Sequence, residues 1–251
     1  MQARPARAAP LIAVIGSDGA GKSTVCKHVL AWVSLYGPAA MVHLGKQSGN
    51  VGRSLGRLPV AGASLDRLLR RKIKKARTRI DAARQPDVLA ALVIGVFVLR
   101  RWLRFRHMLA LRRQGLIVVS DRFPQLKIPG AYDGPQFPSA QKGNPFVRWL
   151  ARREHAAFTW MTSYRPDLVL RLNVDLDTAC ARKPDHSRAT LKEKIAVTPL
   201  LSYHGAPIVD IDTTQPLAKV LEEAAAAVTK LMAEYGYSVS QASQPITGVR
   251  S

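Results

Sequence analysis

One stretch of the chain, residues 11–24 (LIAVIGSDGAGKST), constrains the fold more than any other. Its first five residues form a continuous apolar run, which is typical of a strand buried on both faces in a parallel sheet. The loop that follows has the spacing G-x-x-x-x-G-K-S, and a helical pattern begins after it. Strand, glycine-rich loop and helix in this order predict a P-loop, because glycines let backbone N–H groups turn toward phosphates.

The residues of this loop have expected roles. Lys22 supplies a mobile positive charge to the phosphates of a nucleotide, and the Ser23 hydroxyl is placed to bind Mg²⁺. The N-terminus of the following helix points at the same anion. We therefore expect eight residues to bind a nucleotide: Gly16, Asp18, Gly19, Ala20, Gly21, Lys22, Ser23 and Thr24.

The net positive charge of the chain favours an anionic partner. Its 251 residues include 38 Lys and Arg against 17 Asp and Glu, a formal net charge of +21. Nucleotide phosphates, nucleic acid and an acidic membrane are the candidates. The two cysteines, Cys26 and Cys180, lack metal-binding spacing and are expected as reduced, buried thiols in a cytoplasmic protein.

Two segments bear on membrane contact. The apolar run 88–99 is too short to span a bilayer and predicts a buried helix. Residues 63–84 predict an extra amphipathic helix, whose stretch 66–79 holds eight cations and one acid. This helix is either a solvated face or a surface for an anionic membrane. Nucleic acid is less favoured because no aromatic residues are interleaved to stack on bases. A homodimer remains open.

Strands alternate with helices along the chain, which predicts an α/β fold, that of a P-loop NTPase, with about five parallel strands. We expect one domain over residues 10–235, a disordered basic tail over 1–9 and a flexible tail over 236–251. The loop after the second strand holds Lys46, Arg53 and Arg57, which either face the substrate or are solvated.

Further along the chain, two features complete the expected phosphate site. Asp121 and Arg122 follow a buried strand, where an acid can hold Mg²⁺ and an arginine can reach the transferring phosphoryl group. The alternative for this pair is a cap or turn salt bridge. Basic residues on two short helices over about 182–198 predict a lid that closes on the phosphates.

Together these motifs resemble the thymidylate kinase-like group of P-loop kinases. The resemblance lies in the loop residues 16–24, in Asp121-Arg122-Phe123, and in Pro166-Asp167-Leu168 with Arg182. It implies a five-stranded sheet, a lid, ATP with Mg²⁺, and phosphoryl transfer to a monophosphate. The segment 43–49 differs from the monophosphate-binding segment usual in that family, which leaves the acceptor open.

The resemblance also implies roles for particular residues. Asp18 corresponds to the loop acid that contacts the acceptor sugar, and Asp121 with Arg122 to the pair that handles Mg²⁺ and the phosphate. Phe97 and Arg101 correspond to substrate-binding residues. Gly19 stands where one subgroup has an arginine, so the catalytic cation is expected from the lid. The lid candidates are Arg182, which also corresponds to the residue against the adenine, Lys183, Arg188 and Lys192.

Three functions are compatible with these residues. The first is ATP-dependent phosphoryl transfer to a small acceptor, foremost a nucleoside monophosphate resembling dTMP. The second is the same chemistry on a sugar or lipid-linked acceptor at a membrane. The third is a nucleotide-dependent switch or nucleic-acid-binding ATPase, against which Asp18 and the basic lid argue.

Replacing Lys22 tests the assignment of the loop. Lys22→Ala should lower ATP turnover about 10²- to 10³-fold, because it removes one electrostatic donor from the site. Steady-state turnover with each acceptor in a panel measures the effect. Wild-type turnover of this variant with every acceptor would contradict the assignment.

Overall fold

We describe a computed structural model of the chain, which covers residues 8–45, 88–131, 133–137 and 144–239. The chain divides into two compact units. The described part of the sheet unit comprises residues 8–44, 104–123 and 164–239, and that of the second unit comprises residue 45 together with 88–103, 124–131, 133–137 and 144–163. The basic helix expected over 63–84, the loop cations Lys46, Arg53 and Arg57, and most of both tails lie outside the described residues.

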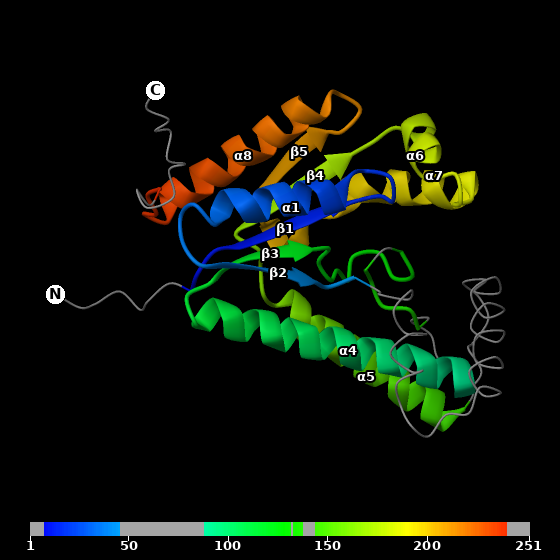
Figure 1. The fold of residues 1–251 in the computed structure, drawn as a ribbon. Helices are drawn as coiled ribbons and strands as arrows, with labels where there is room; N and C mark the ends of the chain where they lie inside the picture. The colour runs from blue at the N-terminus through cyan, green and yellow to red at the C-terminus, as the bar shows by residue number, and fades with distance from the viewer. Residues whose placement is uncertain (1–7, 46–87, 132, 138–143, 240–251) are drawn as a thin grey trace, which may run out of the picture. The chain divides into compact units, whose positions relative to one another are not determined.

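Five parallel strands form the sheet of the first unit in the order β2-β3-β1-β4-β5 (Figure 1). The expected α/β class, a P-loop NTPase fold with five parallel strands, is confirmed. The central strand β1 is buried along its whole length, as its continuous apolar run predicts. The strands are β1 (Leu11–Gly16), β2 (Ala39–His43), β3 (Ile117–Asp121), β4 (Leu168–Asn173) and β5 (Ile208–Asp212).

The helices fall where the sequence patterns place them, with ends shifted by one or two residues. The bounds are α1 (Lys22–Val33), α4 (Val88–Arg113), α5 (Pro145–Thr162), α6 (Leu176–Arg182), α7 (Arg188–Val197) and α8 (Leu217–Glu234), with 3-10 turns η1 (Thr198–Leu200) and η2 (Tyr203–Gly205). After α8, Tyr237 still packs against the core and its N–H donates to the Met232 carbonyl at 2.9 Å. The described chain therefore packs against the core as far as Tyr237.

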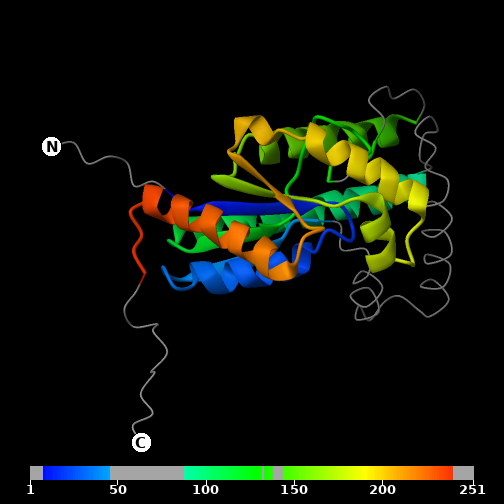
Figure 2. The same ribbon diagram turned by 90° about the horizontal axis from the view of Figure 1, so that it is seen from above.

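The main core of the sheet unit lies between the sheet and the pair α1 and α8, which run side by side over one face (Figures 1 and 2). Val25 and Val29 of α1 and Val228 of α8 are buried against strand residues. Helical spacing of these valines gives each helix one apolar stripe, and burial of that stripe fixes the helix on the sheet.

Asp167 joins three elements of the sheet unit. One carboxylate oxygen, Oδ2, accepts from the Leu11 N–H at 2.9 Å and from Arg112 of α4 at 2.8 Å. The other oxygen accepts from the Tyr235 hydroxyl at the end of α8. Arg112 also donates to the Ala9 carbonyl at 2.7 Å. A carboxylate in the short connection before β4 suggests turn chemistry, yet here it ties β1, α4 and α8 together.

The second unit has its own small core and two internal polar anchors. Ala91 of α4 packs with Phe137, Val147 and Ala151. Buried Arg101 donates to Asp133 through both terminal nitrogens, each at 2.8 Å, and its guanidinium stacks over Phe158. The unit therefore uses an arginine on α4 to order the loop before α5.

The expectation of a buried helix over 88–99 is half right. The helix is present, but five of its apolar side chains are exposed: Val88, Leu89, Leu92, Val96 and Leu99. A short apolar run indicates low polarity and does not by itself show that every face is covered. Within the described ranges no helix is both long and apolar enough to cross a membrane.

Removing the Asp167 carboxylate tests its part in the fold. Asp167→Ala should lower the free energy of unfolding by about 2–4 kcal/mol, because it leaves a half-buried guanidinium and a backbone N–H without their acceptor. Urea denaturation measures the change. The control Asp177→Ala breaks an ion pair to Arg188 that is largely exposed, so its effect should stay below about 1 kcal/mol. Equal losses in the two variants would contradict the assignment.

Candidate functional site

The P-loop joins β1 to α1 and is shaped by glycines. Gly19 and Gly21 have φ of 89° and 77°, values that L side chains rarely adopt. The loop closes through a hydrogen bond from the Ala20 N–H to the Ser17 carbonyl at 3.2 Å. Lys22 is buried and its Nζ donates to the same carbonyl at 2.6 Å. The lysine is thus held against the loop where phosphates are expected to bind.

Gly19 also sets how close α6 can come. A Cβ at this position would lie 3.0 Å from both the Cα and the carbonyl oxygen of Ala179. The backbones of the loop and of α6 are therefore in direct contact, and no side chain fits between them. This agrees with the expectation that the loop supplies no arginine here and that cations must come from elsewhere.

Cations from several segments surround Asp18. Arg122 donates to Oδ1 at 2.9 Å, Lys194 of α7 donates to Oδ2, and His186 and Lys22 lie 3.8 and 3.9 Å away. Burial raises the pKa of Asp18, but the Lys194 hydrogen bond and the charges of Lys194, Arg122 and Lys22 outweigh it. The net result is a pKa well below the ordinary value, so this carboxylate is ionised.

Arg122 reaches Asp18 from a strained backbone. Its φ of 71° lies in the left-handed region, which is unusual for a residue other than glycine. Its N–H donates to the Val14 carbonyl at 2.9 Å, so the residue is fixed beside β1. The pair Asp121-Arg122 is therefore more than a simple turn: its two side chains face different partners at the end of the sheet.

Asp121 has one satisfied oxygen and one orphan. His43, its register partner on β2, contacts Oδ2 through Nδ1 at 2.7 Å. Burial raises the pKa of Asp121, while the hydrogen bond and charge of His43, with Arg122 and Lys22, lower it below the ordinary value. Within the part of the chain that the structure describes, its buried Oδ1 has no hydrogen-bond partner, and neither does Ser17 Oγ.

This orphan oxygen fits a Mg²⁺ ion or its waters. A buried carboxylate oxygen without a donor is costly unless a cation or water completes it. Ser23, at the exposed first turn of α1, offers the expected hydroxyl. The described residues contain no group of three or more His, Cys, Asp or Glu placed to hold a metal by themselves. A Mg²⁺ ion here would take its remaining ligands from phosphates and water.

Two short helices, α6 and α7, lie where the lid is expected, and their cations differ in where they point. Arg182 donates to the Gly19 carbonyl at 3.3 Å and to the Thr213 carbonyl after β5 at 2.9 Å, so it bridges the P-loop and the next strand end. Arg188 pairs with Asp177. Lys183 and Lys192 are exposed. Of the lid cations, Lys194 is the one in contact with Asp18.

Phe97 and Arg101 belong to the second unit, whereas the residues gathered around Asp18 belong to the sheet unit. Arg101 is buried and bound to Asp133, and Phe97 is half-buried on α4. Their expected role in binding substrate stays a prediction.

Sequence patterns missed three residues of the Asp18 and Asp121 surroundings. Lys194 was one lysine of a basic helix, His186 read as a lid or surface histidine, and His43 only as the end of a strand. His43 could have been found from the sheet order, because β2 and β3 are neighbours and end together. Cys26 is buried, as expected, and burial, then Asp121, raises the pKa of its thiol, which makes the thiol unreactive. The expectation of burial is wrong for Cys180, which is only partly buried.

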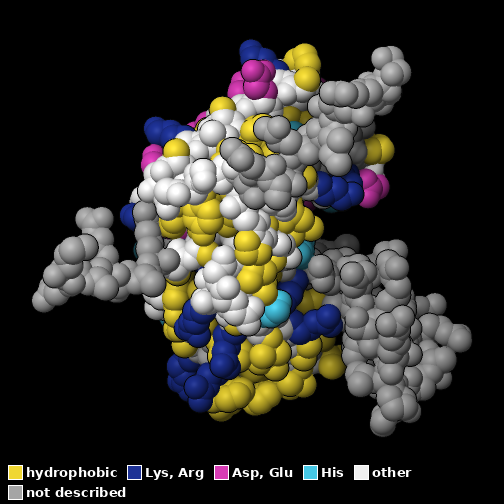
Figure 3. Space-filling view, turned by 60° about the vertical axis from the view of Figure 1, so that its left-hand side comes forward, with side chains coloured by type: hydrophobic (Ala, Val, Ile, Leu, Met, Phe, Trp, Pro, Cys, Tyr) yellow, Lys and Arg dark blue, Asp and Glu magenta, His cyan; other side chains and the backbone are white. Residues whose placement is uncertain are grey.

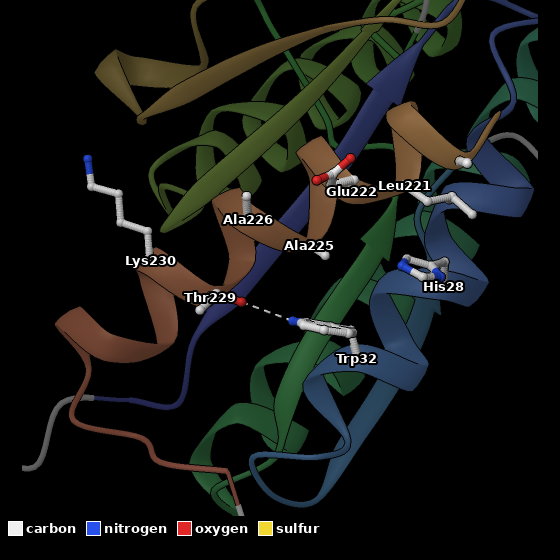
Figure 4. A pocket seen from close by; sticks show the side chains of 9 residues that line it. His28, Trp32, Leu221, Glu222, Ala225, Ala226, Thr229 and Lys230 are labelled. Atoms are coloured by element: carbon white, nitrogen blue, oxygen red, sulfur yellow. Dashed lines mark hydrogen bonds between the residues drawn. The ribbon is translucent and has the colours of Figure 1, made fainter. Parts of the chain in front are cut away.

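A separate groove lies between α1 and α8 (Figure 4). It has a volume of about 790 Å³ and includes Leu221, Ala225 and Trp32, whose Nε1 donates to Thr229 at 3.0 Å. Its lining is mostly apolar and includes none of the loop residues. The groove is therefore no part of the phosphate site.

Comparison with known proteins extends beyond the loop. No family model matches the chain. The uncharacterized ATP-binding protein YghS of Escherichia coli (strain K12) is 39% identical over 219 residues, which are 87% of this chain and 92% of YghS. The uncharacterized ATP-binding protein YghR of the same strain is 39% identical over 220 residues, 87% of this chain and 86% of YghR. The similarity covers most of each chain.

The low pKa of Asp18 predicts a pH-dependent contribution to stability. Because the folded carboxyl has the lower pKa, its stabilising effect is complete above the unfolded value near 4 and is lost as pH falls through the folded value. Asp18→Asn removes this effect. We expect the variant to be less stable by about 1–2 kcal/mol at neutral pH and the difference to shrink below about pH 4.

Urea denaturation at a series of pH values measures this difference. The control Asp185→Asn alters an exposed carboxylate next to His186 and should change the free energy of unfolding by less than about 0.5 kcal/mol. A constant difference between wild type and Asp18→Asn at all pH values would contradict the prediction.

Proposed function

The chain belongs to the family of the ATP-binding proteins YghS and YghR, and on that premise we propose that it binds ATP and transfers the γ-phosphoryl group to a small acceptor. One observation carries the proposal: Lys22, Arg122 and Lys194 meet at Asp18 beside the glycine loop. Cations from three segments at one end of a parallel sheet suit a polyphosphate better than a single anion.

In this proposal, ATP binding replaces part of the interaction of these cations with Asp18 by an interaction with the phosphates. Without nucleotide, the Asp18 carboxylate holds the cations in place. When ATP enters, Lys22 turns from the Ser17 carbonyl to the phosphates, and Arg122 and Lys194 share their donors between Asp18 and the phosphoryl oxygens. These donors are already placed where negative charge develops, so little reorganisation is needed during transfer.

Mg²⁺ would be held by Ser23 and Asp121. The ion neutralises phosphate charge when it is bound with ATP. His43 fixes Asp121 by its Oδ2 and leaves the buried Oδ1 for the ion or its waters. Arg182, held between the Gly19 and Thr213 carbonyls, lies against the adenine, as the thymidylate kinase-like resemblance implies.

The acceptor we propose is a nucleoside monophosphate. This choice rests on the thymidylate kinase-like resemblance, because the names of the relatives specify ATP and no acceptor. The same resemblance implies that Asp18 contacts the acceptor sugar and that Phe97 and Arg101 are substrate-binding residues. Positioning and charge carry the reaction, since the attacking phosphate oxygen is already anionic. A sugar or lipid-linked acceptor is the alternative within the same chemistry.

An acceptor screen tests the proposal. The protein is incubated with ATP and Mg²⁺ and with dTMP, dUMP, other nucleoside monophosphates, sugars or lipid acceptors, and ADP and phosphorylated product are measured. Acceptor-dependent ADP formation with a monophosphate supports the proposal. ATP binding with no phosphorylated product, together with steeply salt-dependent binding to DNA or RNA, would favour a switch or a nucleic-acid-binding ATPase instead.

Lys194 should matter more than the exposed lysines of the described residues. Lys194→Met removes a cation that faces the loop, so we expect kcat to fall about 10²-fold. Lys27→Met removes an exposed lysine of α1 and should change kcat less than about twofold. Turnover with the best acceptor of the screen measures both. Equal activity of the two variants would remove Lys194 from the mechanism.

A further inference from the structure

The first half of α4 presents an uncovered apolar face. Six aliphatic side chains, spaced mostly three or four residues apart, each have 38–55% of their surface exposed, and we call them the apolar stripe: Val88, Leu89, Leu92, Val96, Leu99 and Leu103. Residues at this spacing lie on one side of a helix. Soluble proteins rarely leave such a row in water without a partner.

Aromatic side chains of α5 add to this face. Phe146 and Trp149 are 40% and 44% exposed, and their rings stack with centroids 6.0 Å apart. The helices pack closely within the second unit, since a Cβ on Gly95 of α4 would lie 3.2 Å from Leu150 of α5. Of the twelve large hydrophobic side chains exposed among the described residues, eight lie on α4 and α5. Figure 3 shows hydrophobic side chains gathered beside Lys and Arg at the lower end of the view.

Exposed arginines lie beside the aromatic residues of this face, and the two helices expose no acid. α4 has no Asp or Glu, but three of its six arginines, Arg101, Arg104 and Arg112, are bonded inside the protein, so the cations that matter here are those of α5. α5 exposes Arg148, Arg152 and Arg153, and the guanidinium of Arg153 lies 5.4 Å from the ring centroid of Trp149. The one acid of α5, Glu154, is buried and accepts the N–H groups of Gln136 and Phe137 at 2.8–3.0 Å. The Glu154 carboxylate is thus bound inside the unit and adds no exposed negative charge to this face.

The apolar stripe and the exposed arginines together favour one class of partner over the others. A second copy of the chain would bring the same arginines to the contact, and like charges would oppose pairing. Nucleic acid offers phosphates but no apolar layer for aliphatic side chains. An anionic bilayer offers both, since its headgroups attract arginines and its acyl region accepts Leu, Val, Phe and Trp. We propose that the apolar stripe, with Phe146 and Trp149, docks on the surface of an anionic lipid bilayer.

In the docked state α4 lies along the bilayer surface. The stripe enters the boundary between headgroups and acyl chains, and the arginine stems extend their charges toward the headgroups. Trp149, with a polar N–H and an apolar ring, suits the same depth. The contact is peripheral, and it holds whichever acceptor the P-loop serves.

Vesicle flotation tests the proposal with the full chain. Wild-type protein should float with vesicles of phosphatidylcholine and phosphatidylglycerol, and about tenfold less with phosphatidylcholine alone. Val96→Gln with Leu99→Gln, both at exposed positions, should lower partitioning at least about tenfold. Leu217→Gln, at a position as exposed on α8, is the matched control and should float like wild type.

Two further experiments test the contribution of the arginines and the depth to which Trp149 inserts. Arg148→Gln with Arg153→Gln should lower partitioning about fivefold per arginine at low salt. Arg188→Gln, an exposed arginine of α7, is the control for charge. Tryptophan emission should shift to the blue on adding anionic vesicles, and Trp149→Phe should remove most of that shift. Circular dichroism and thermal unfolding of every variant show that it folds.

Several results would overturn the proposal. One is the absence of flotation with anionic vesicles at low salt. Another is equal flotation of wild type and the Val96→Gln, Leu99→Gln variant. A third is a dimer in sedimentation experiments that dissociates when the stripe is changed, which would assign this face to a second copy of the chain.

Discussion

The carboxylate of Asp18 is the interaction on which the candidate site depends. It is the internal counter-ion for Lys22, Arg122 and Lys194, which come from α1, from the end of β3 and from α7. Three cations so close together would repel one another and turn toward solvent if no anion lay among them. Arg122 makes this contact from a left-handed backbone, and α7 contacts the loop through Lys194. The arrangement is thus held by a charge of the kind that the site is proposed to bind.

Sequence alone predicts the sheet unit well, because its signals are local. Continuous apolar runs mark β1 and β3, and the glycine spacing places the loop between β1 and α1. Contacts between segments distant in the chain do not follow from such local signals. Lys194 is 176 residues from Asp18, and no pattern near it shows which of the lysines on α7 faces the loop. His43 required the order of the strands, which places β2 beside β3.

In the second unit, the composition of a segment does not predict which of its side chains are buried. An apolar run over 88–99 suggested burial, yet the spacing of its leucines and valines leaves one side of α4 in solvent. Arg101 illustrates the opposite case: no sequence pattern near it indicates that it is buried, with Asp133 as its partner and the Phe158 ring beneath it. In both cases the burial of the side chain depends on tertiary contacts, which a sequence pattern does not show.

The contact between Gly19 and Ala179 has a mechanical consequence for α6 and the P-loop. Where two backbones touch, no flexible side chain lies between them to absorb a displacement. A displacement of α6 toward the loop would therefore have to be matched by a displacement of the loop backbone at Gly19. The positions of α6 and of the P-loop are thus coupled through their backbones.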